Sequence, residues 1–174
     1  PGLYVEGALE MTWDELVEGG YLTFSDEGAT LTGVHEGLYG RLVVSEDVTA
    51  YGGTAFLSSS LEEVWSPCTI PEINGVFGGA PELKTVRFFG DVTDLGYACF
   101  RGAEKLESIV IPDSVRVIPE QCFSGCASLA SVTLPASLET IDGDAFSGTA
   151  ALTHIEFPEG LKAIGGGAFY GSGI

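Results

Sequence analysis

Basic side chains are scarce in this 174-residue chain. Lysine and arginine together number 7, against 25 aspartate and glutamate residues, so the formal net charge is −18 at pH 7. A surface of this charge repels phosphate backbones and anionic lipid headgroups. The composition therefore argues against nucleic acid as a partner and against direct binding or insertion into a membrane.

Long apolar runs are also missing. No stretch approaches the roughly 18 consecutive apolar residues of a membrane-spanning helix. The N-terminal residues Pro1-Gly2-Leu3 show no basic region followed by an apolar stretch, so we expect any signal peptide to have been removed or to lie outside this sequence. The hydrophobic content is nevertheless 45%, which is ample for the core of one continuous domain.

An internal repeat is the most prominent feature that is present. The tripeptide Phe-x-Gly recurs every 23 residues, each time after Cys or Ala, at Phe100, Phe123, Phe146 and Phe169. Leucines keep the same spacing at Leu83, Leu106, Leu129 and Leu152, and prolines do so at Pro112, Pro135 and Pro158. A period of about 20 to 29 residues is typical of a leucine-rich solenoid.

Each repeat combines two sequence patterns. In the unit 106–128, Ile109 and Ile111 have the spacing of 2 by which a strand points alternate side chains into a core, and the proline that follows ends the strand. Residues 115–118 predict a second, shorter extended stretch. Pro119, which suits a first helical position, and Gly125, which suits a closing left-handed residue, then predict about one helical turn.

The same template predicts six repeats over residues 39–174. They begin at Tyr39, Leu61, Leu83, Leu106, Leu129 and Leu152, and the first two are one residue short. Ile174 falls where the leucine of a next unit would stand, so we expect the repeats to continue beyond it. Each repeat buries its apolar face only against its neighbours, and the ends of such an array therefore need caps.

Residues 1–38 do not fit the repeat and are predicted to form an N-terminal cap. Thr12-Trp13-Asp14-Glu15 has the pattern of a capping box, which predicts a helix over about 12–19 that stops at two glycines. A β-hairpin is expected over about 21–34, with its turn at residues 25–28.

From Tyr39 to the end, the units resemble the BspA-type leucine-rich repeat, also called the Treponema pallidum type. The residues that carry the resemblance most fully are Leu129, Val132, Leu134, Pro135, Leu138, Ile141, Ala145, Phe146 and Gly148. This chain departs from the pattern at Ala103 and Thr149, where the family has cysteine, and at Ser66, which replaces an apolar strand residue.

The resemblance implies a leucine-rich repeat solenoid, that is, a right-handed β/α superhelix rich in strand with short helical turns. It also implies a secreted or cell-surface bacterial protein whose repeats bind a protein, such as a host extracellular-matrix protein or a bacterial surface protein. The family's repeats share no catalytic motif. We therefore expect a non-catalytic adhesion or protein-binding module that needs no cofactor.

The predicted strands leave two columns of side chains on an open sheet face. The first column is Arg41, Glu63, Thr85, Ser108, Ser131 and His154, and the second is Val43, Trp65, Arg87, Val110, Thr133 and Glu156. A tryptophan beside Glu63 and one repeat from Arg87 has the composition of an interface hot spot. The candidate binding residues are Trp65, Arg87, Arg41, Glu63, His154 and Glu156.

Each of these assignments has an alternative. Trp65 could instead be covered by the cap or turned inward, because its repeat is irregular. His154 follows Ser131 in its column with Glu156 on the same face, which also fits a Ser-His-Glu triad. An open sheet face offers neither a concave pocket nor oxyanion donors, so we favour a solvated polar ladder there.

The cysteines and the acidic residues give no clear metal site. Cys99 and Cys122 share one position in successive repeats and lie within disulfide range, but the alanines found there in other repeats favour buried free thiols. Cys122 and Cys126 lack the second ligand pair of a zinc site. Acidic residues are concentrated in the N-terminal part without the alternating loop of a calcium site, which favours a solvated acidic surface.

Two other functions stay open besides a binding module. The repeats could form a structural stalk or spacer in a larger surface protein, or they could be an accessory region attached to a catalytic domain outside this chain. For the binding module, the net charge favours a basic patch on the partner. Binding would then weaken as the salt concentration rises.

Overall fold

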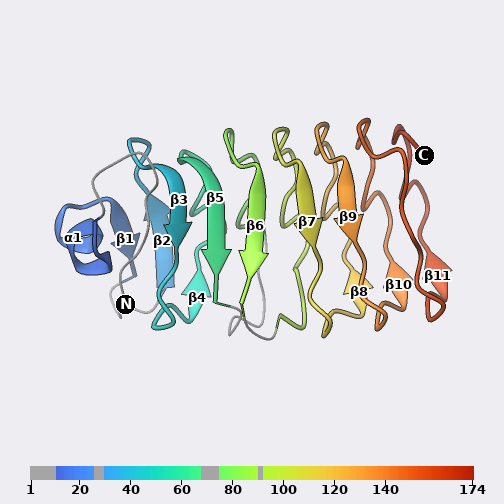
Figure 1. The fold of residues 1–174 in the computed structure, drawn as a ribbon, viewed down its shortest axis with the longest axis horizontal. Coiled ribbons are helices and arrows are strands. Elements are labelled where there is room, and N and C mark those ends of the chain that lie inside the picture. The colour runs from blue at the N-terminus through green and yellow to red at the C-terminus, as the bar shows by residue number, and fades with distance from the viewer. Residues whose placement is uncertain (1–10, 26–29, 68–74, 90–91) are drawn as a thin grey trace.

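The computed structural model of this chain describes residues 11–25, 30–67, 75–89 and 92–174. Over these residues the chain winds into a solenoid, in which the strands of successive repeats lie side by side along the long axis (Figure 1). The N-terminal helix lies at one end and the C-terminus at the other (Figure 1). The solenoid predicted from the repeat period is confirmed.

The larger sheet is parallel and contains five strands. Their order is β3 (Tyr39–Val43), β5 (Ser60–Ser66), β6 (Thr85–Phe88), β7 (Ser108–Val110) and β9 (Ser131–Thr133). In the first predicted column, Arg41, Glu63, Thr85, Ser108 and Ser131 are register partners in succession. In the second column, Trp65 pairs with Val43 on one side and with Arg87 on the other. The predicted columns are confirmed over these strands.

The sixth repeat does not extend this sheet. Residues 152–158 form no strand, so the prediction that His154 and Glu156 lie on a sheet face is wrong. Among the described residues, residues 153–158 form no backbone hydrogen bond with β9, which is the next strand of the stack. The backbone of the sixth repeat instead joins the stack through its second stretch and its turn.

The second stretches of the last three repeats form a separate parallel sheet. Strands β8 (Val117–Ile118), β10 (Thr140–Ile141) and β11 (Ala163–Ile164) pair in the order β11-β10-β8. In the first repeat the corresponding strand β4 (Ala50–Tyr51) pairs with the cap rather than with these strands. The two short extended stretches of the repeat thus lie in different sheets of the solenoid (Figure 1).

The cap consists of one helix and one hairpin. Helix α1 (Trp13–Glu18) begins with a capping box, in which the Thr12 side chain accepts from the Glu15 N–H and the Glu15 carboxylate accepts from the Thr12 N–H. Strands β1 (Leu22–Phe24) and β2 (Thr30–Val34) pair antiparallel, and β2 also pairs in parallel with β4. The hairpin and β4 therefore form a third sheet, in the order β1-β2-β4, at this end of the solenoid. Its expected turn falls mainly on residues 26–29, which lie outside the described residues.

The helical turn expected at residues 119–125 is wrong. Gln121 has φ +57° and Gly125 has φ +76°, and a left-handed residue inside the segment interrupts the right-handed conformation that a helix requires. The N–H groups of Gln121, Phe123 and Gly125 instead donate to carbonyls of the next repeat at 3.1, 2.8 and 2.8 Å. These segments are stacked turns, and α1 is the only helix in the described part of the chain.

A column of phenylalanine rings fills the core. The rings of Phe56, Phe77, Phe100, Phe123, Phe146 and Phe169 stack in succession with centroids 4.9 to 5.2 Å apart. Parallel rings at this separation add to the stability gained from burial. Phe77 belongs to a further Phe-x-Gly triplet, in which valine precedes the phenylalanine in place of cysteine or alanine.

The described cysteines are buried in the same core. Cys99, Cys122 and Cys126 are free thiols, and burial raises the pKa of each one above its usual value, to about 12 for Cys126. The Cys126 thiol donates to the Phe100 carbonyl at 3.1 Å, and at the equivalent position the Thr149 hydroxyl donates to the Phe146 carbonyl at 2.8 Å. Cys68 lies outside the described residues.

A candidate binding face on the larger sheet

Four of the six predicted binding residues form one cluster on the outer face of the larger sheet. Arg41 comes from β3, Glu63 and Trp65 from β5, and Arg87 from β6. They meet because residues two apart on a strand point to the same face, and because the register sets β3 and β6 on either side of β5. We call Arg41, Glu63, Trp65 and Arg87 the arginine–tryptophan cluster.

Glu63 lies at the centre of this cluster. Arg41 donates from Nε to Glu63 Oε2 at 2.5 Å, and Trp65 donates from Nε1 to Glu63 Oε1 at 2.7 Å. The Nε atom of Arg87 forms an ion pair with Glu63 Oε1 at 3.1 Å. Only 15% of the Glu63 side chain is exposed. Its carboxylate is thus occupied by its neighbours and holds them in place.

The electrostatics of the cluster keep Glu63 ionised. Partial burial by itself raises the pKa of Glu63, but the hydrogen bonds from Trp65 and Arg41 and the charges of Arg41 and Arg87 outweigh it, so the pKa is lowered overall. An ionised Glu63 balances one of the two arginines. The cluster therefore carries a net charge of about +1 at neutral pH, since arginine stays protonated.

Two guanidinium groups lie over the Trp65 ring. The Cζ atoms of Arg41 and Arg87 are 5.2 and 5.5 Å from its centroid, within the range of cation–π attraction. The arginines reach the ring from strands on either side of β5. The indole is therefore already covered by side chains of this protein, and it is Arg87, with 65% of its side chain exposed, that faces solvent.

The pairing of β3 with β5 shifts register between Gly40 and Arg41, and Trp65 keeps its predicted place beyond this irregularity. Trp65 has not turned inward, because it contacts the surface residues Glu63, Arg41 and Arg87. Its neighbour Ser66 is fully buried, and the Ser66 hydroxyl lies 2.8 Å from the hydroxyl of Tyr51. A polar side chain at a core position is thus satisfied by hydrogen bonding, which removes most of the cost of burying it.

The other two predicted residues lie apart from the cluster. His154 and Glu156 belong to the sixth repeat, about three repeats or 14 Å along the stack from β6 at the usual strand spacing. Their side chains are 80% and 93% exposed, with His154 Nε2 3.8 Å from Glu156 Oε1. In the described residues Ser131 forms no hydrogen bond with His154, so the alternative Ser-His-Glu triad is not assembled here.

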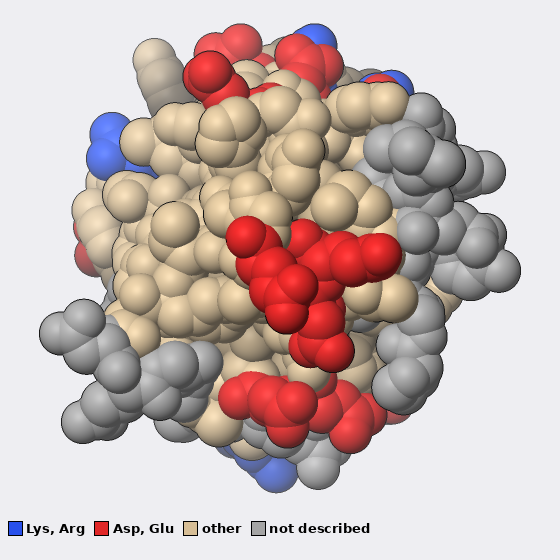
Figure 2. All heavy atoms as spheres, turned by 90° about the vertical axis from the view of Figure 1, so that its left-hand side faces the viewer, with Lys and Arg blue, Asp and Glu red and all other residues tan. Residues whose placement is uncertain are grey.

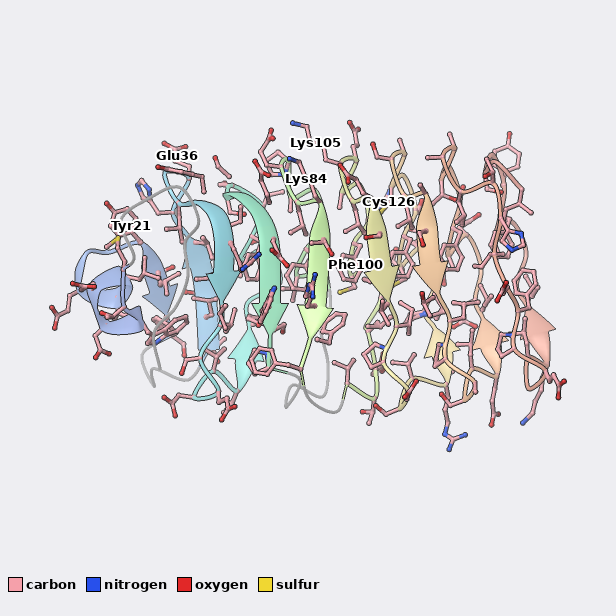
Figure 3. All side chains as sticks on the ribbon, viewed as in Figure 1. Tyr21, Glu36, Lys84, Phe100, Lys105 and Cys126 are labelled. Carbon is pink, nitrogen blue, oxygen red and sulfur yellow. The ribbon has the colours of Figure 1, made fainter. Side chains whose placement is uncertain are left out.

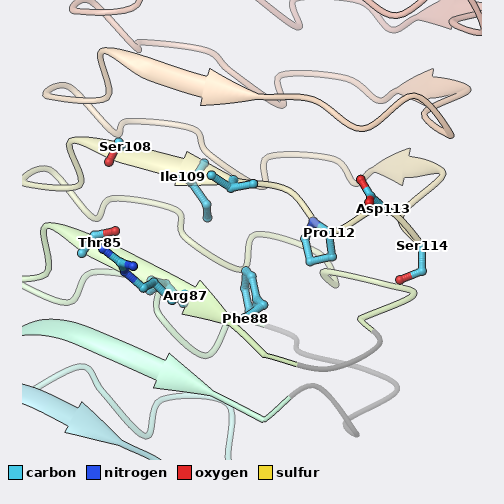
Figure 4. Close-up of a pocket in the computed structure, with 10 residues that line it drawn as sticks. Thr85, Arg87, Phe88, Ser108, Ile109, Pro112, Asp113 and Ser114 are labelled. Atoms are coloured by element: carbon cyan, nitrogen blue, oxygen red, sulfur yellow. The ribbon is translucent and has the colours of Figure 1, made fainter. Parts of the chain in front are cut away.

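Two open hollows adjoin Arg87. The larger, of about 840 Å³, is lined by residues 85–88, 108–110 and 112–114 (Figure 4). The other, of about 560 Å³, is lined by residues 39–41, 62–63, 84–85, 87 and 107–108. Asp113 and Ser114 were missed by the sequence reasoning, because they lie in the turn beyond the strand rather than in the outward columns.

Most other basic residues are tied to acidic residues of a neighbouring repeat. Lys84 pairs with Glu62 at 2.7 Å and Lys105 with Glu82 at 2.6 Å, and both lysines project from the edge of the solenoid where the larger sheet begins (Figure 3). Glu139 pairs with both Arg116 and Lys162, and their charges and hydrogen bonds lower its pKa. Exposed pairs of this kind contribute little to stability.

Acidic side chains gather near the centre of the cap end of the solenoid, and the basic side chains of the described residues in this view lie at its rim (Figure 2). Asp14, Glu15 and Glu18 of α1 are all exposed. Over the described residues, no group of three or more His, Cys, Asp or Glu side chains is arranged to hold a metal ion. Within the same residues no helix is long and apolar enough to cross a membrane.

The stacked parallel strands, the phenylalanine column and the repeat period together define a leucine-rich repeat solenoid. The chain belongs to the BspA-type leucine-rich repeat family, because the family described as "BspA type Leucine rich repeat region" matches residues 49–174 in 6 copies. Repeat domains of this kind occur in bacterial surface proteins, generally mediate protein–protein interaction and are generally non-catalytic. The predicted family and fold class are thus confirmed.

Two solved structures illustrate the likeness. The chain is similar to a leucine-rich repeat protein from Eubacterium ventriosum, with 25% identity and a TM-score of 0.67 over 84% of this chain and 44% of that one. It is also similar to a leucine rich cell surface protein from Faecalibacterium prausnitzii, with 23% identity and a TM-score of 0.55 over 97% of this chain and 52% of that one. The chain thus spans about half the length of these proteins. No curated protein matches it.

Proposed function

We propose that this domain is a non-catalytic protein-binding module of a secreted or cell-surface bacterial protein. It binds a macromolecular partner, such as a host extracellular-matrix protein or a bacterial surface protein, through the outer face of the larger sheet. The membership of the BspA-type family supports the class of function. The similar Faecalibacterium prausnitzii protein is itself described as a cell surface protein.

The observation that carries this proposal is the arginine–tryptophan cluster. Tryptophan and arginine are enriched at the energetic centres of protein interfaces. Here they are held in one arrangement by the shared Glu63 carboxylate and by the stacking of Arg41 and Arg87 on Trp65. Side chains that are ordered before binding lose little conformational entropy on association, which favours affinity. His154 and Glu156 would form a second, peripheral contact area on the same proposal.

The experiment is a binding screen of immobilised extracellular-matrix and bacterial surface proteins against the parent domain and a Trp65→Ala/Arg87→Ala variant. The matched control is Arg101→Ala/Tyr170→Ala, which also removes one arginine and one aromatic ring, but from exposed positions in the stacked turns. A partner bound by the parent and the control but lost by the first variant supports the proposal. Equal binding by all three places the contact elsewhere, and no binding at all favours a stalk.

A further inference from the structure

The outer face of the larger sheet differs in charge from the rest of the protein. The chain as a whole carries a net charge of −18. On this face, however, the ladder from β3 to β9 contains Arg41 and Arg87 against Glu63, together with serine, threonine, valine and tryptophan. The most basic part of the face is therefore the point where Arg87 meets solvent.

Arg87 has hydrogen-bonding capacity that the structure does not use. Its Nε atom faces Glu63 at 3.1 Å, and its guanidinium lies over Trp65. Among the described residues, neither of its Nη atoms donates a hydrogen bond. A guanidinium presents its N–H groups in a rigid planar fork that matches the two oxygens of a carboxylate. Glu63 and Trp65 thus fix the orientation of a fork whose outer edge is open.

The hollow beside Arg87 offers further contacts of a kind that suits a polypeptide. Thr85 and Ser108 contribute hydroxyl groups, and Val110, which is 65% exposed, contributes an apolar surface. Figure 4 shows Arg87 and Thr85 on one side of the hollow and Asp113 and Ser114 on the other. The hollow thus combines one basic end, one acidic end and a mixed centre, whereas its walls contain no second basic residue.

We propose that Arg87 binds the carboxylate of an aspartate or glutamate side chain of the protein partner, which sits in the hollow next to β6 and β7. This inference rests on the proposed function and specifies its chemistry. It differs from the expectation, drawn from the net charge, that the partner presents a basic patch. The negative charge of the rest of the domain still attracts basic surfaces at long range, while the contact at Arg87 is with an acid.

A single carboxylate fits better than a polyanion or an acidic sugar. The domain's net charge of −18 repels a chain of sulfates, uronates or phosphates, but it tolerates one acidic side chain within a neutral or basic segment. Sugar rings bind proteins by stacking on open aromatic faces, whereas the Trp65 ring is covered by Arg41 and Arg87. A peptide segment needs no such ring, because its contacts are hydrogen bonds and apolar side chains.

The test uses a display library of linear 12-residue peptides whose C-termini are attached to the carrier, selected on the parent domain. Selected peptides are then synthesised with amidated C-termini, each paired with a copy in which Glu or Asp is replaced by Gln or Asn. The selected peptides are expected to share one acidic residue. Its replacement is expected to weaken binding by about tenfold or more, the usual effect of losing a hydrogen bond to a charged group.

Variants of the domain identify the contact. Arg87→Gln should weaken binding of the acidic peptide by about the same factor and leave binding of its amide copy unchanged. Arg87→Lys should bind the acidic peptide more tightly than Arg87→Gln does, because it keeps the charge. Arg101→Gln, at another exposed arginine, should change neither. In nuclear magnetic resonance spectra the Arg87 Nε–H signal should shift with the acidic peptide only. Thermal unfolding of each variant reports whether the fold is intact.

Two results would overturn the inference in distinguishable ways. The carboxylate contact would be rejected if the selected peptides share no acidic residue. It would also be rejected, with the sheet face kept as the binding site, if the peptides bind Arg87→Gln as well as the parent but no longer bind Val110→Asp. Peptides that bind every variant equally, or the selection of none, would reject the sheet face itself and with it the proposed function. Selective binding of a glucuronate oligosaccharide would reject the peptide assignment.

Discussion

The phenylalanine column predicts that the cost of removing a ring depends on its position in the stack. Phe123 is fully buried and lies between Phe100 at 5.2 Å and Phe146 at 5.1 Å. Phe169 is the last ring of the column, is partly buried, and stacks on Phe146 alone at 5.2 Å with an edge contact to Phe157 at 5.8 Å. The two positions have the same residue and the same local turn but different surroundings.

Replacing Phe123 by alanine should cost about 3–5 kcal/mol of unfolding free energy, the usual range for a buried phenylalanine, because the ring leaves a cavity between two rings that cannot close around it. The same change at Phe169 should cost about 2 kcal/mol less, since part of that ring is already in water and one stacking neighbour is missing. Urea unfolding followed by far-ultraviolet circular dichroism measures both values.

The difference in unfolding free energy between the Phe123 and Phe169 variants tests whether the rings form one buried column. Equal losses at Phe123 and Phe169, or a loss below about 1 kcal/mol at Phe123, would show that the rings do not form one buried column. A Phe123→Leu variant serves as the control for volume, because leucine restores most of the buried apolar surface without the ring. It should recover part of the loss at Phe123 but not the stacking contribution, which is about 0.5–1.5 kcal/mol per pair.

Three further predictions concern the cluster, the thiols and the turns. Glu63→Gln should lower the free energy of unfolding by about 1.5–3 kcal/mol near neutral pH. Because the pKa of Glu63 is lowered on folding, this contribution exists above the unfolded-state pKa and disappears as the pH falls through the folded-state pKa. The free energies of unfolding in urea of the parent and the variant should therefore converge in acid. The buried thiols of Cys99, Cys122 and Cys126 have raised pKa values, so they should resist iodoacetamide at about pH 8 in the folded domain and react in urea. Fast labelling of these cysteines in the native protein, detected by peptide mass spectrometry, would contradict their burial. Gly125→Ala should cost about 1–2 kcal/mol because φ is +76° there although space is available, and an unchanged melting temperature would contradict that backbone argument.

The repeat made the sheet register predictable from the sequence. A spacing of 22 or 23 residues brings equivalent side chains next to each other whatever their chemistry, so the alignment of Arg41, Glu63 and Thr85 in one column followed from counting. The same counting failed for residues 152–158, because a strand also requires backbone hydrogen bonds to a neighbour. Among the described residues, residues 153–158 form no such bond with β9.

The turns were less predictable because residue type alone does not indicate their backbone conformation. Equivalent positions in successive repeats are Gly75, Ala98, Gln121, Asp144 and Gly167, and all five have positive φ. Only the two glycines signal a left-handed conformation in the sequence. Hydrogen bonds between repeats and the stacked rings hold the other three residues in the left-handed conformation. A local sequence pattern does not predict such tertiary effects.

The chemistry of the candidate site was predictable in part. The composition of the columns placed Trp65, Arg87, Arg41 and Glu63 together, and the structure brings them into contact. The sequence indicated Trp65 as an interface hot spot on an open sheet face, whereas in the structure two guanidinium groups lie over its ring and Arg87 is the more exposed side chain. Which donors share one carboxylate depends on side-chain rotamers, and these follow from packing rather than from spacing.

The most direct test of the central claim is the affinity of a captured partner for the parent, the Trp65→Ala/Arg87→Ala variant and the Arg101→Ala/Tyr170→Ala control, measured side by side. If the outer face of the larger sheet is the binding site, the first variant should bind at least about thirtyfold more weakly, as expected for the loss of residues at the centre of an interface. The control should bind like the parent. A loss confined to the control, or the same affinity for all three proteins, would contradict the account.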